Sequence, residues 1–349
     1  MGRQLDSGHD QPGSPSAVFR TDVLNRQLDP YKRADTGRSL FELAVTAGPL
    51  AALWGLGWAA ASAGLWPLAL LLTVPAAFFL VRLFLIQHDC GHGAFFAGKA
   101  ANDWTGRLIS VFTLTPYACW KHTHAVHHAT SGDLDRRDQG AGDIDTLTVE
   151  EYRGLSPLKQ FGYRLYRHPL VLFGFGPAFL YFLQQRLPVG QMRQGWWPWA
   201  SALGNTAAVA AVYGGLIWWL GVGPVLLVTV LSTALAATIG VWLFYVQHQF
   251  EGTVWTRSPE WKARGAAFHG SSFYDLPAPL QWLTAHIGVH HVHHLSSRIP
   301  FYRLPEVLRA HPELRGYGRI GLKDSFRFAR LALWDEQRGR LVGFRDVTA

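Results

Sequence analysis

Charged side chains are scarce in this sequence. They make up 16% of its 349 residues, whereas soluble domains average about 25%. Hydrophobic residues reach 49% and aromatic residues 13%. Such a composition is typical of a membrane protein, and it argues against an ordinary soluble domain.

Cysteine is nearly absent as well. Only Cys90 and Cys119 occur, which excludes a disulfide framework and a CxxC metal pair and is consistent with a reducing compartment. The first 40 residues are polar and lack the short apolar core of a signal peptide. We therefore expect residues 1–40 to form a cytosolic N-terminal segment.

Long apolar runs take the place of charge. Four stretches each have about the 20 residues that a membrane-spanning helix needs, and short links join them in pairs. Arg82, near the end of the second stretch, is expected to snorkel to the membrane interface. The sequence predicts an all-α integral membrane protein with two transmembrane hairpins. The predicted spans are residues 41–61, 67–87, 196–220 and 224–246.

Basic residues orient these spans. The net charge is +8, and residues 1–40, 88–195 and 247–349 carry six, eleven and fourteen Lys or Arg, whereas the two hairpin turns carry none. By the positive-inside rule, the termini and the central loop face the cytosol. This distribution favours a membrane surface over nucleic acid as the partner. The apolar pieces of the central loop, 108–120 and 169–183, are too short to span and predict interfacial or re-entrant helices.

Histidine is abundant, with 16 in the chain. Most lie in three clusters with i, i+3 and i, i+4 spacings, which place side chains on one helical face. A single His248 follows the fourth span. The first cluster is His88 and His92, the second is His124, His127 and His128, and the third is His290, His293 and His294.

The predicted topology brings the clusters together. Two spans separate the second cluster from the third, so all three emerge on the same membrane face, in a predicted helical cap on the cytosolic side. Neutral imidazole suits Fe, Zn, Cu and Ni, and this many ligands implies more than one ion. The Glu-x-x-His motif of soluble diiron bundles and the His-Glu-x-x-His motif of zinc proteases are both absent. An all-histidine dinuclear site in a membrane suits the cleavage of an unactivated C–H bond, for which a metal must activate O₂.

The clusters and their flanks resemble the three histidine boxes of membrane fatty acid desaturases, in particular the bacterial acyl-lipid branch near the Δ12 and ω-type enzymes. The similarity covers roughly residues 41–304, which would form the desaturase domain, with 305–349 as a cytosolic tail. The matching segments are RLFLIQHDCGHGAFF (82–96), WKHTHAVHHATSG (120–132), GDIDTLTVEEY (142–152), FYVQHQFEGTVW (244–255) and HHVHHLSSRIPFYRL (290–304).

The resemblance implies two non-haem iron ions, held by the three clusters and by His248, which matches an extra ligand of stearoyl-type enzymes. It also implies that the eight boxed histidines are catalytic. By the same similarity, His88, His128, His248, His290 and His294 would hold one iron, and His92, His124, His127 and His293 the other.

Neighbouring polar residues have more ordinary interpretations. His122 is expected to face away from its cluster, which favours a surface or supporting role for it. His291 and His286 share the helical face of predicted ligands, so a ligand role stays open for both. Asp89, Asp133 and Asp135 could accept the free N–H of ligating imidazoles. The other histidines, His9, His168, His269 and His311, are expected at the surface.

We expect an O₂-dependent desaturase in the inner (plasma) membrane. It would introduce a double bond into a long acyl chain of a lipid or another carrier, with electrons from a separate donor such as ferredoxin, since no fused carrier module is visible. A membrane hydroxylase or ketolase of alkyl chains or carotenoids is the alternative, because related enzymes share the boxes. A metal transporter is a more remote one, because transport sites lie near the bilayer midplane, whereas these histidines lie at or beyond the predicted helix ends.

Overall fold

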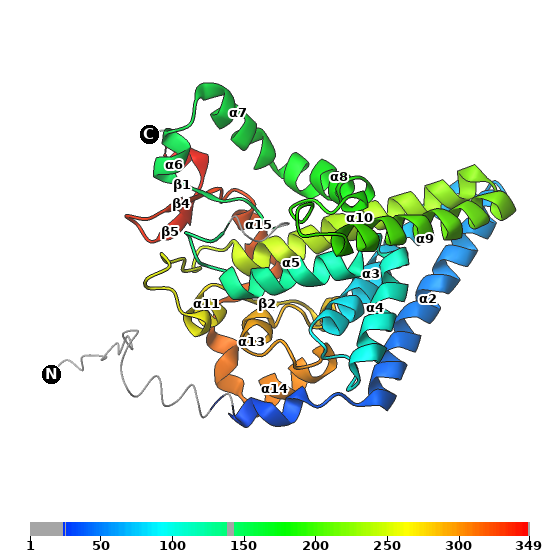
Figure 1. Ribbon diagram of the computed structural model, residues 1–349, viewed down its shortest axis with the longest axis horizontal. Helices are drawn as coiled ribbons and strands as arrows, with labels where there is room; N and C mark the ends of the chain where they lie inside the picture. The colour runs from blue at the N-terminus through cyan, green and yellow to red at the C-terminus, as the bar shows by residue number, and fades with distance from the viewer. Residues whose placement is uncertain (1–23, 25, 138–142, 348–349) are drawn as a thin grey trace.

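The computed structural model describes residues 24, 26–137 and 143–347. Within them the chain is mostly helical (Figure 1), which confirms the predicted fold class. Most of the predicted N-terminal segment, including His9, lies outside the described residues.

Four helices are long and apolar enough to cross a membrane. They overlap the predicted spans. The second continues four residues beyond its predicted end and the fourth continues two, so they include His88 and His248, which the sequence predicts just beyond the helix ends. The four helices are α2 (Thr36–Ser62), α3 (Trp66–Gly91), α9 (Trp197–Leu220) and α10 (Val222–His248).

Tight turns connect the two helices of each hairpin. Gly64 follows α2 with a φ of 77°, and Gly221 separates α9 from α10 with a φ of 85°, a region of backbone space that glycine enters without steric cost. Pro67 lies in the first turn of α3, where the missing N–H would be unpaired in any case. Figure 1 shows the two hairpin tips together at the right, away from the remaining elements.

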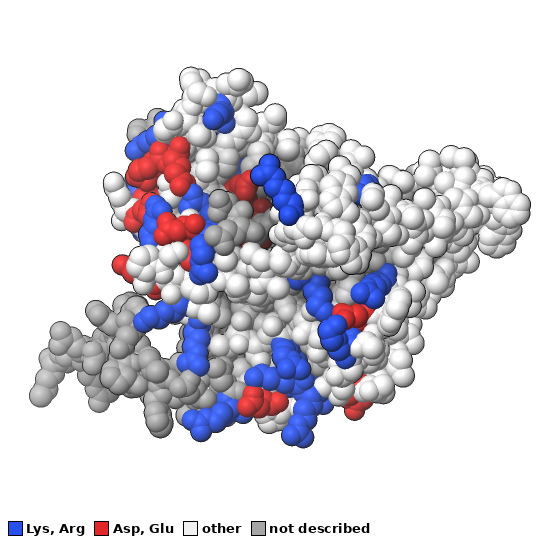
Figure 2. Space-filling view, viewed as in Figure 1, with Lys and Arg blue, Asp and Glu red and all other residues white. Residues whose placement is uncertain are grey.

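The two hairpins pack through small residues and one buried hydrogen bond. Nε1 of Trp54 on α2 donates to Oγ of Ser232 on α10 over 3.0 Å. Gly57 lets the same helices approach, because an added Cβ would lie 3.0 Å from Val228. Helix α9 is mostly exposed, and Figure 2 shows no charge on this face of the arm that the hairpin tips form. Such an uncharged arm suits contact with lipid.

Short helices and strands surround the histidine-bearing ends of the long helices, and we call them the cap. Charged residues gather over the cap in Figure 2. Its helices are α4 (Lys99–Phe112), α5 (Tyr117–Thr130), α6 (Val149–Arg153), α7 (Pro157–Tyr166), the π-helix η2 (Val171–Phe175), α8 (Gly176–Phe182), α11 (Ala263–His269), α12 (Ala278–Leu283), α13 (His290–Leu295), α14 (Leu304–Ala310) and α15 (Leu322–Phe328), with 3₁₀ turns η1 (Asp29–Lys32), η3 (Gln184–Arg186), η4 (Phe301–Arg303), η5 (Pro312–Gly316) and η6 (Phe344–Asp346).

Five short strands in the cap were not predicted. They form one sheet in the order β1-β4-β5 and a second sheet of β2 and β3. The β1–β4 and β2–β3 pairs are parallel. The later strand of each pair, β4 or β3, therefore hydrogen-bonds to a segment more than 40 residues earlier in the chain. Residues beyond 304 thus pack on the rest of the chain. The strands are β1 (Leu147–Thr148), β2 (Phe273–Asp275), β3 (Arg319–Gly321), β4 (Leu333–Asp335) and β5 (Arg340–Val342).

The sequence predicts that Arg82 reaches the membrane interface. This prediction is wrong, because the side chain is buried, with 1% of its surface exposed. Its guanidinium pairs with the buried carboxylate of Glu42 on α2, and its Nε donates to Oγ1 of Thr46 over 3.1 Å. The same group lies 4.1 Å from the ring of Trp282 and 5.1 Å from that of Phe301. The charge is therefore satisfied inside the protein, next to the cap.

We expect Glu42→Gln to destabilise the protein by about 3–5 kcal/mol, because it leaves the buried Arg82 charge without its carboxylate. The measurement is the free energy of unfolding in a denaturing-detergent titration. Arg38→Met is the control: Arg38 also pairs with Glu42 but is half exposed, so its loss is expected to cost less than about 1 kcal/mol. Equal losses in the two variants would contradict this account of the pair.

Candidate metal centre

The structure brings nine histidines together next to the C-terminal ends of α3 and α10. They come from α3 and the residue that follows it, from α5, from the last turn of α10 and from α13. Their ring nitrogens form two groups, in each of which the nearest nitrogens lie within 4.8 Å of one another. The first group is His88, His92, His124, His128 and His293, and the second group is His127, His248, His290 and His294.

The Nε2 atoms face one another inside each group. In the first group, Nε2 of His124 lies 3.0 Å from that of His92 and 3.2 Å from that of His128, which lies 3.1 Å from that of His293. The ring of His88 lies within 4.7 Å of the rings of His92 and His124. The five rings thus surround one small volume.

The second group has the same arrangement. Nε2 of His248 lies 3.2 Å from that of His127 and 3.0 Å from that of His290, which lies 3.1 Å from that of His294. The two groups touch: the rings of His128 and His294 stack with centroids 4.2 Å apart. The arrangement is that of two adjacent ligand sets.

Two of the helices contribute histidines to both groups. In α5, the i, i+4 pair His124 and His128 joins the first group, while His127 turns into the second. In α13 the division is mirrored, because His290 and His294 join the second group and His293 the first. The structure therefore groups His88 and His128 with the first set and His127 with the second, unlike the partition that the resemblance implies.

Burial keeps six of these imidazoles neutral. Loss of hydration, followed by the neighbouring imidazoles, holds the pKa values of six of them well below the usual range. Neutral imidazole is the form that binds a metal ion. The six are His92, His124, His128, His290, His293 and His294.

A hydrogen bond on the other ring nitrogen of His248 shows that its Nε2 lone pair points into the second group. Nδ1 of His248 lies 3.1 Å from the carbonyl oxygen of Gly270, which can only accept, so Nδ1 carries the proton and Nε2 is a bare lone pair. That lone pair faces the Nε2 atoms of His127 and His290. Several acceptors aimed at one buried volume repel each other unless a cation lies among them, so the residues fit a metal ion in each group.

A carboxylate supports the first group. Nδ1 of His88 lies 3.2 Å from Oδ1 of Asp89, and Oδ2 of Asp89 accepts a hydrogen bond from the backbone N of Phe301 over 2.7 Å. Asp89 is 2% exposed. The predicted role of Asp89 as a partner of an imidazole N–H agrees with this geometry.

The two other predicted carboxylates have different partners. Asp133 is bound by Arg136 and Ser258, and Asp135 by Arg257 and the backbone N of Ser258. The carboxylate that does approach the second group is Asp143, which the sequence analysis missed: its Oδ1 lies 2.8 Å from Nδ1 of His127. Asp143 lies in one of the segments with family resemblance, but spacing alone cannot place a loop residue against a helix.

The remaining histidines of the described residues lie outside both groups. His122 packs its ring 5.6 Å from that of Trp197. His286 has a φ of 53°, and its Nδ1 lies 3.3 Å from Oε1 of Gln281. His291 is fully buried, and its ring lies 6.0 Å from that of Phe273. Of the three expected surface histidines within the described residues, His168 and His269 are exposed, as predicted. His311 differs: its side chain is only 13% exposed, and its ring lies 6.4 Å from that of Tyr31.

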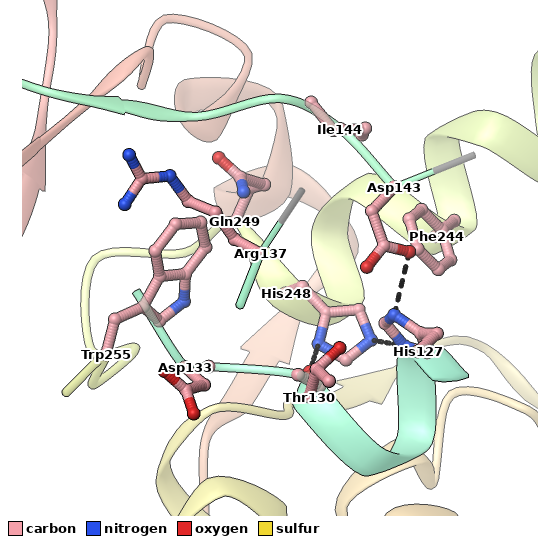
Figure 3. Close-up of a pocket in the computed structure, with 12 residues that line it drawn as sticks. His127, Thr130, Asp133, Arg137, Asp143, Ile144, Phe244, His248, Gln249 and Trp255 are labelled. Carbon is pink, nitrogen blue, oxygen red and sulfur yellow. Dashed lines mark hydrogen bonds and ion pairs between the residues drawn. The ribbon is translucent and has the colours of Figure 1, made fainter. Parts of the chain in front are cut away.

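Two hollows lie in the region of the histidines, one against the second group and one separated from the first group by aromatic rings. A polar one opens beside the second group; Figure 3 shows His127 between His248 and Asp143, with Gln249 and Trp255 on the opposite wall. The other is almost entirely apolar and lies between α3, α8 and α10. Its lining residues are Leu80, Val81, Phe84, Thr113, Tyr181, Thr233, Ala236, Ala237 and Gly240.

Comparison with known proteins identifies the family. The sequence model of the fatty acid desaturase family matches residues 63–324. A Bacillus subtilis protein named fatty acid desaturase is 39% identical over 329 residues, which cover 93% of this chain and 91% of that protein. This chain belongs to the fatty acid desaturase family. The prediction from the histidine clusters is thereby confirmed, and the desaturase is an oxidoreductase.

More distant members of the desaturase family match over much of the chain too. A Synechocystis protein named sn-1 acyl-lipid omega-3 desaturase (ferredoxin) is 28% identical over 65% of this chain and 63% of its own length. An omega-3 fatty acid desaturase of the endoplasmic reticulum from Vigna radiata is 22% identical over 90% of this chain and 82% of its own length.

We expect His92→Ala to lower the metal content of the purified desaturase by at least one ion per chain, because it removes one Nε2 from the first group. Elemental analysis by mass spectrometry measures this. The control is His122→Ala, which removes a histidine of the same region that lies against Trp197 and is expected to leave the metal content unchanged. Unchanged metal in His92→Ala would contradict a ligand role.

Proposed function

We propose that this desaturase inserts a double bond into a long acyl chain at a histidine-bound diiron centre. The observation that carries the proposal is the pair of touching histidine groups with converging ring nitrogens, in a chain of the fatty acid desaturase family. When bound, two iron ions would supply the O₂ activation that removal of two hydrogens from an unactivated chain requires.

Each group would hold one iron. The first group offers five imidazoles and the second four, and the stacked rings of His128 and His294 keep the two sets adjacent. Asp89 holds one ring of the first group in place and thereby contributes to the geometry of the ligand set. Burial of the rings excludes bulk water from the centre.

The apolar hollow is a suitable place for the acyl chain. It is lined by α3 and α10 within the long-helix bundle, where a lipid tail can enter from the bilayer. Phe84 on its wall lies 5.4 Å from the ring of Trp120, and Trp120 stacks on His124 with centroids 4.7 Å apart. The hollow thus lies one aromatic layer away from the first group.

The membrane setting and the electron source are part of the proposal. The basic loops favour an inner-membrane protein with the cap in the cytosol, where an anionic lipid headgroup or carrier would meet positive charge. The name of the Synechocystis relative includes ferredoxin, and a separate ferredoxin-type donor could supply the two electrons at the same face. The substrate would be an acyl lipid or another acyl-chain carrier.

Lipid profiling of an aerobic host that expresses the protein tests the reaction. We expect a new double bond in the host acyl chains, seen by mass spectrometry as a loss of two hydrogens, because family membership and the buried site both favour desaturation. The His92→Ala variant is expected to abolish it. A gained oxygen atom would indicate the hydroxylase alternative, and no change at any chain length would count against both.

A second test concerns the hollow. Gly240→Leu is expected to reduce activity on long chains relative to shorter ones, because nothing lies within 4 Å of an added Cβ and the new side chain occupies the hollow. Each excluded methylene loses about 0.8 kcal/mol, or roughly fourfold in binding. The measurement is the product profile with acyl chains of graded length.

Gly204→Leu is the matched control for that test. Gly204 also lies in a long helix with nothing within 4 Å of an added Cβ, but it does not line the hollow. Its product profile is expected to match that of the unmodified protein. An identical profile for Gly240→Leu would exclude this hollow as the acyl site.

A further inference from the structure

The Nδ1 atom of His127 is a buried polar atom that has an anionic neighbour but no aligned hydrogen bond. His127 is 4% exposed, and its Nδ1 makes no hydrogen bond within the part of the chain that the structure describes. Oδ1 of Asp143 lies 2.8 Å away, which is hydrogen-bond distance. The contact lacks only alignment.

The contact with Asp143 bears on which ring nitrogen of His127 carries the proton. Nε2 of His127 faces Nε2 of His248 inside the second group. An imidazole that presents its Nε2 lone pair to a metal ion carries its proton on Nδ1, and a buried N–H needs an acceptor. The carboxylate of Asp143 is the acceptor in reach, and a small rotation of either side chain aligns the two.

The first group already has such a pair. His88 contacts Asp89, and Asp89 is fixed in turn by the backbone N of Phe301. Asp143 contacts Nδ1 of His127 in the same way that Asp89 contacts Nδ1 of His88. In each group, one carboxylate thus lies next to the Nδ1 atom of one imidazole. The two differ in access: Asp89 is fully buried, whereas the Asp143 side chain is 22% exposed and lies on the wall of the polar hollow (Figure 3).

We propose that Asp143 is a positioning residue for the second group: its carboxylate accepts the Nδ1–H of His127, fixes the tautomer and ring orientation, and raises the basicity of Nε2 toward the metal ion. This inference rests on the proposed diiron function. Partners of this kind typically change metal affinity or activity by about 10–100-fold when they are removed.

The test compares Asp143→Ala and Asp143→Asn with Asp135→Asn as a matched control. Asp135 is a carboxylate of the same loop region that pairs with Arg257 at the surface and touches no histidine. Iron per chain and Mössbauer spectra are measured on purified protein during titration with a chelator, with circular dichroism to verify the fold. Asp143→Ala is expected to release one iron at a chelator concentration about 10–100-fold lower, whereas Asp135→Asn behaves like the unmodified protein.

Two further readouts separate positioning from mere support of the fold. Asp143→Asn retains a carbonyl that can accept the N–H but lacks the charge, so its iron release is expected between those of Asp143→Ala and the unmodified protein. Because the hollow is open, added formate is expected to refill the space in Asp143→Ala and to restore iron retention, whereas chloride does not.

Each outcome decides one question. Two irons per chain with unchanged chelator sensitivity in Asp143→Ala overturns the positioning role and leaves the proposed function intact. Loss of circular dichroism signal in Asp143→Ala together with full iron retention in Asp143→Asn and no formate rescue also overturns it. Absence of iron from the unmodified protein instead overturns the diiron proposal itself.

Discussion

The repulsion between buried imidazole lone pairs is the constraint on which this structure depends. Nine rings point nitrogen atoms at two adjacent volumes. Burial holds the pKa values of six of them well below the usual range, because burial disfavours the charged form. The surrounding elements must hold so many converging rings in place. The long helices, the aromatic layer and the cap can all be understood as supports for these rings.

Some of the contacts that hold the histidine rings lie next to them, and others lie farther away. Trp120 fills the space against α3 so closely that a Cβ on Gly91 would lie 2.8 Å from its ring, which fixes the first cluster against the second. Tyr117 on the same helix donates to the carbonyl of Cys90 over 2.9 Å. Farther out, the buried Glu42–Arg82 pair lies beside Phe301, whose backbone N holds Asp89. A chain of contacts thus runs from α2 to His88.

The sequence predicts the members of the centre better than their arrangement. Spacing along helices and an even number of spans suffice to bring His124, His127 and His128 near the third cluster, because both are local properties. How the nine divide depends on the rotation of α5 and α13 about their axes, which spacing does not determine. Asp143 belongs to a loop, and its approach to His127 arises from packing that no periodicity records.

The contrast between local sequence patterns and packing between distant segments also explains why the burial of Arg82 and the five strands were not predicted. Arg82 has the position of a snorkelling residue in its own helix, but its partner Glu42 lies on α2, and a pairing between helices cannot be read from either one. The strands have only two or three residues, too few to show the alternation by which strands are recognised. The four long helices, by contrast, follow from hydrophobicity alone.

The parallel pairing of β1 with β4 has a consequence for how the protein is made. Leu147 lies opposite Leu333, so the segment just beyond Asp143 acquires its partner only after residue 333 has been synthesised. Domains fold from the N-terminal end during synthesis, at about 5–20 residues per second, and the first histidine pair is complete long before that point. Neither group is complete before α13 has been made, because α13 contributes histidines to both. The strand that pairs with the segment next to Asp143 follows about forty positions after the last histidine of the third cluster.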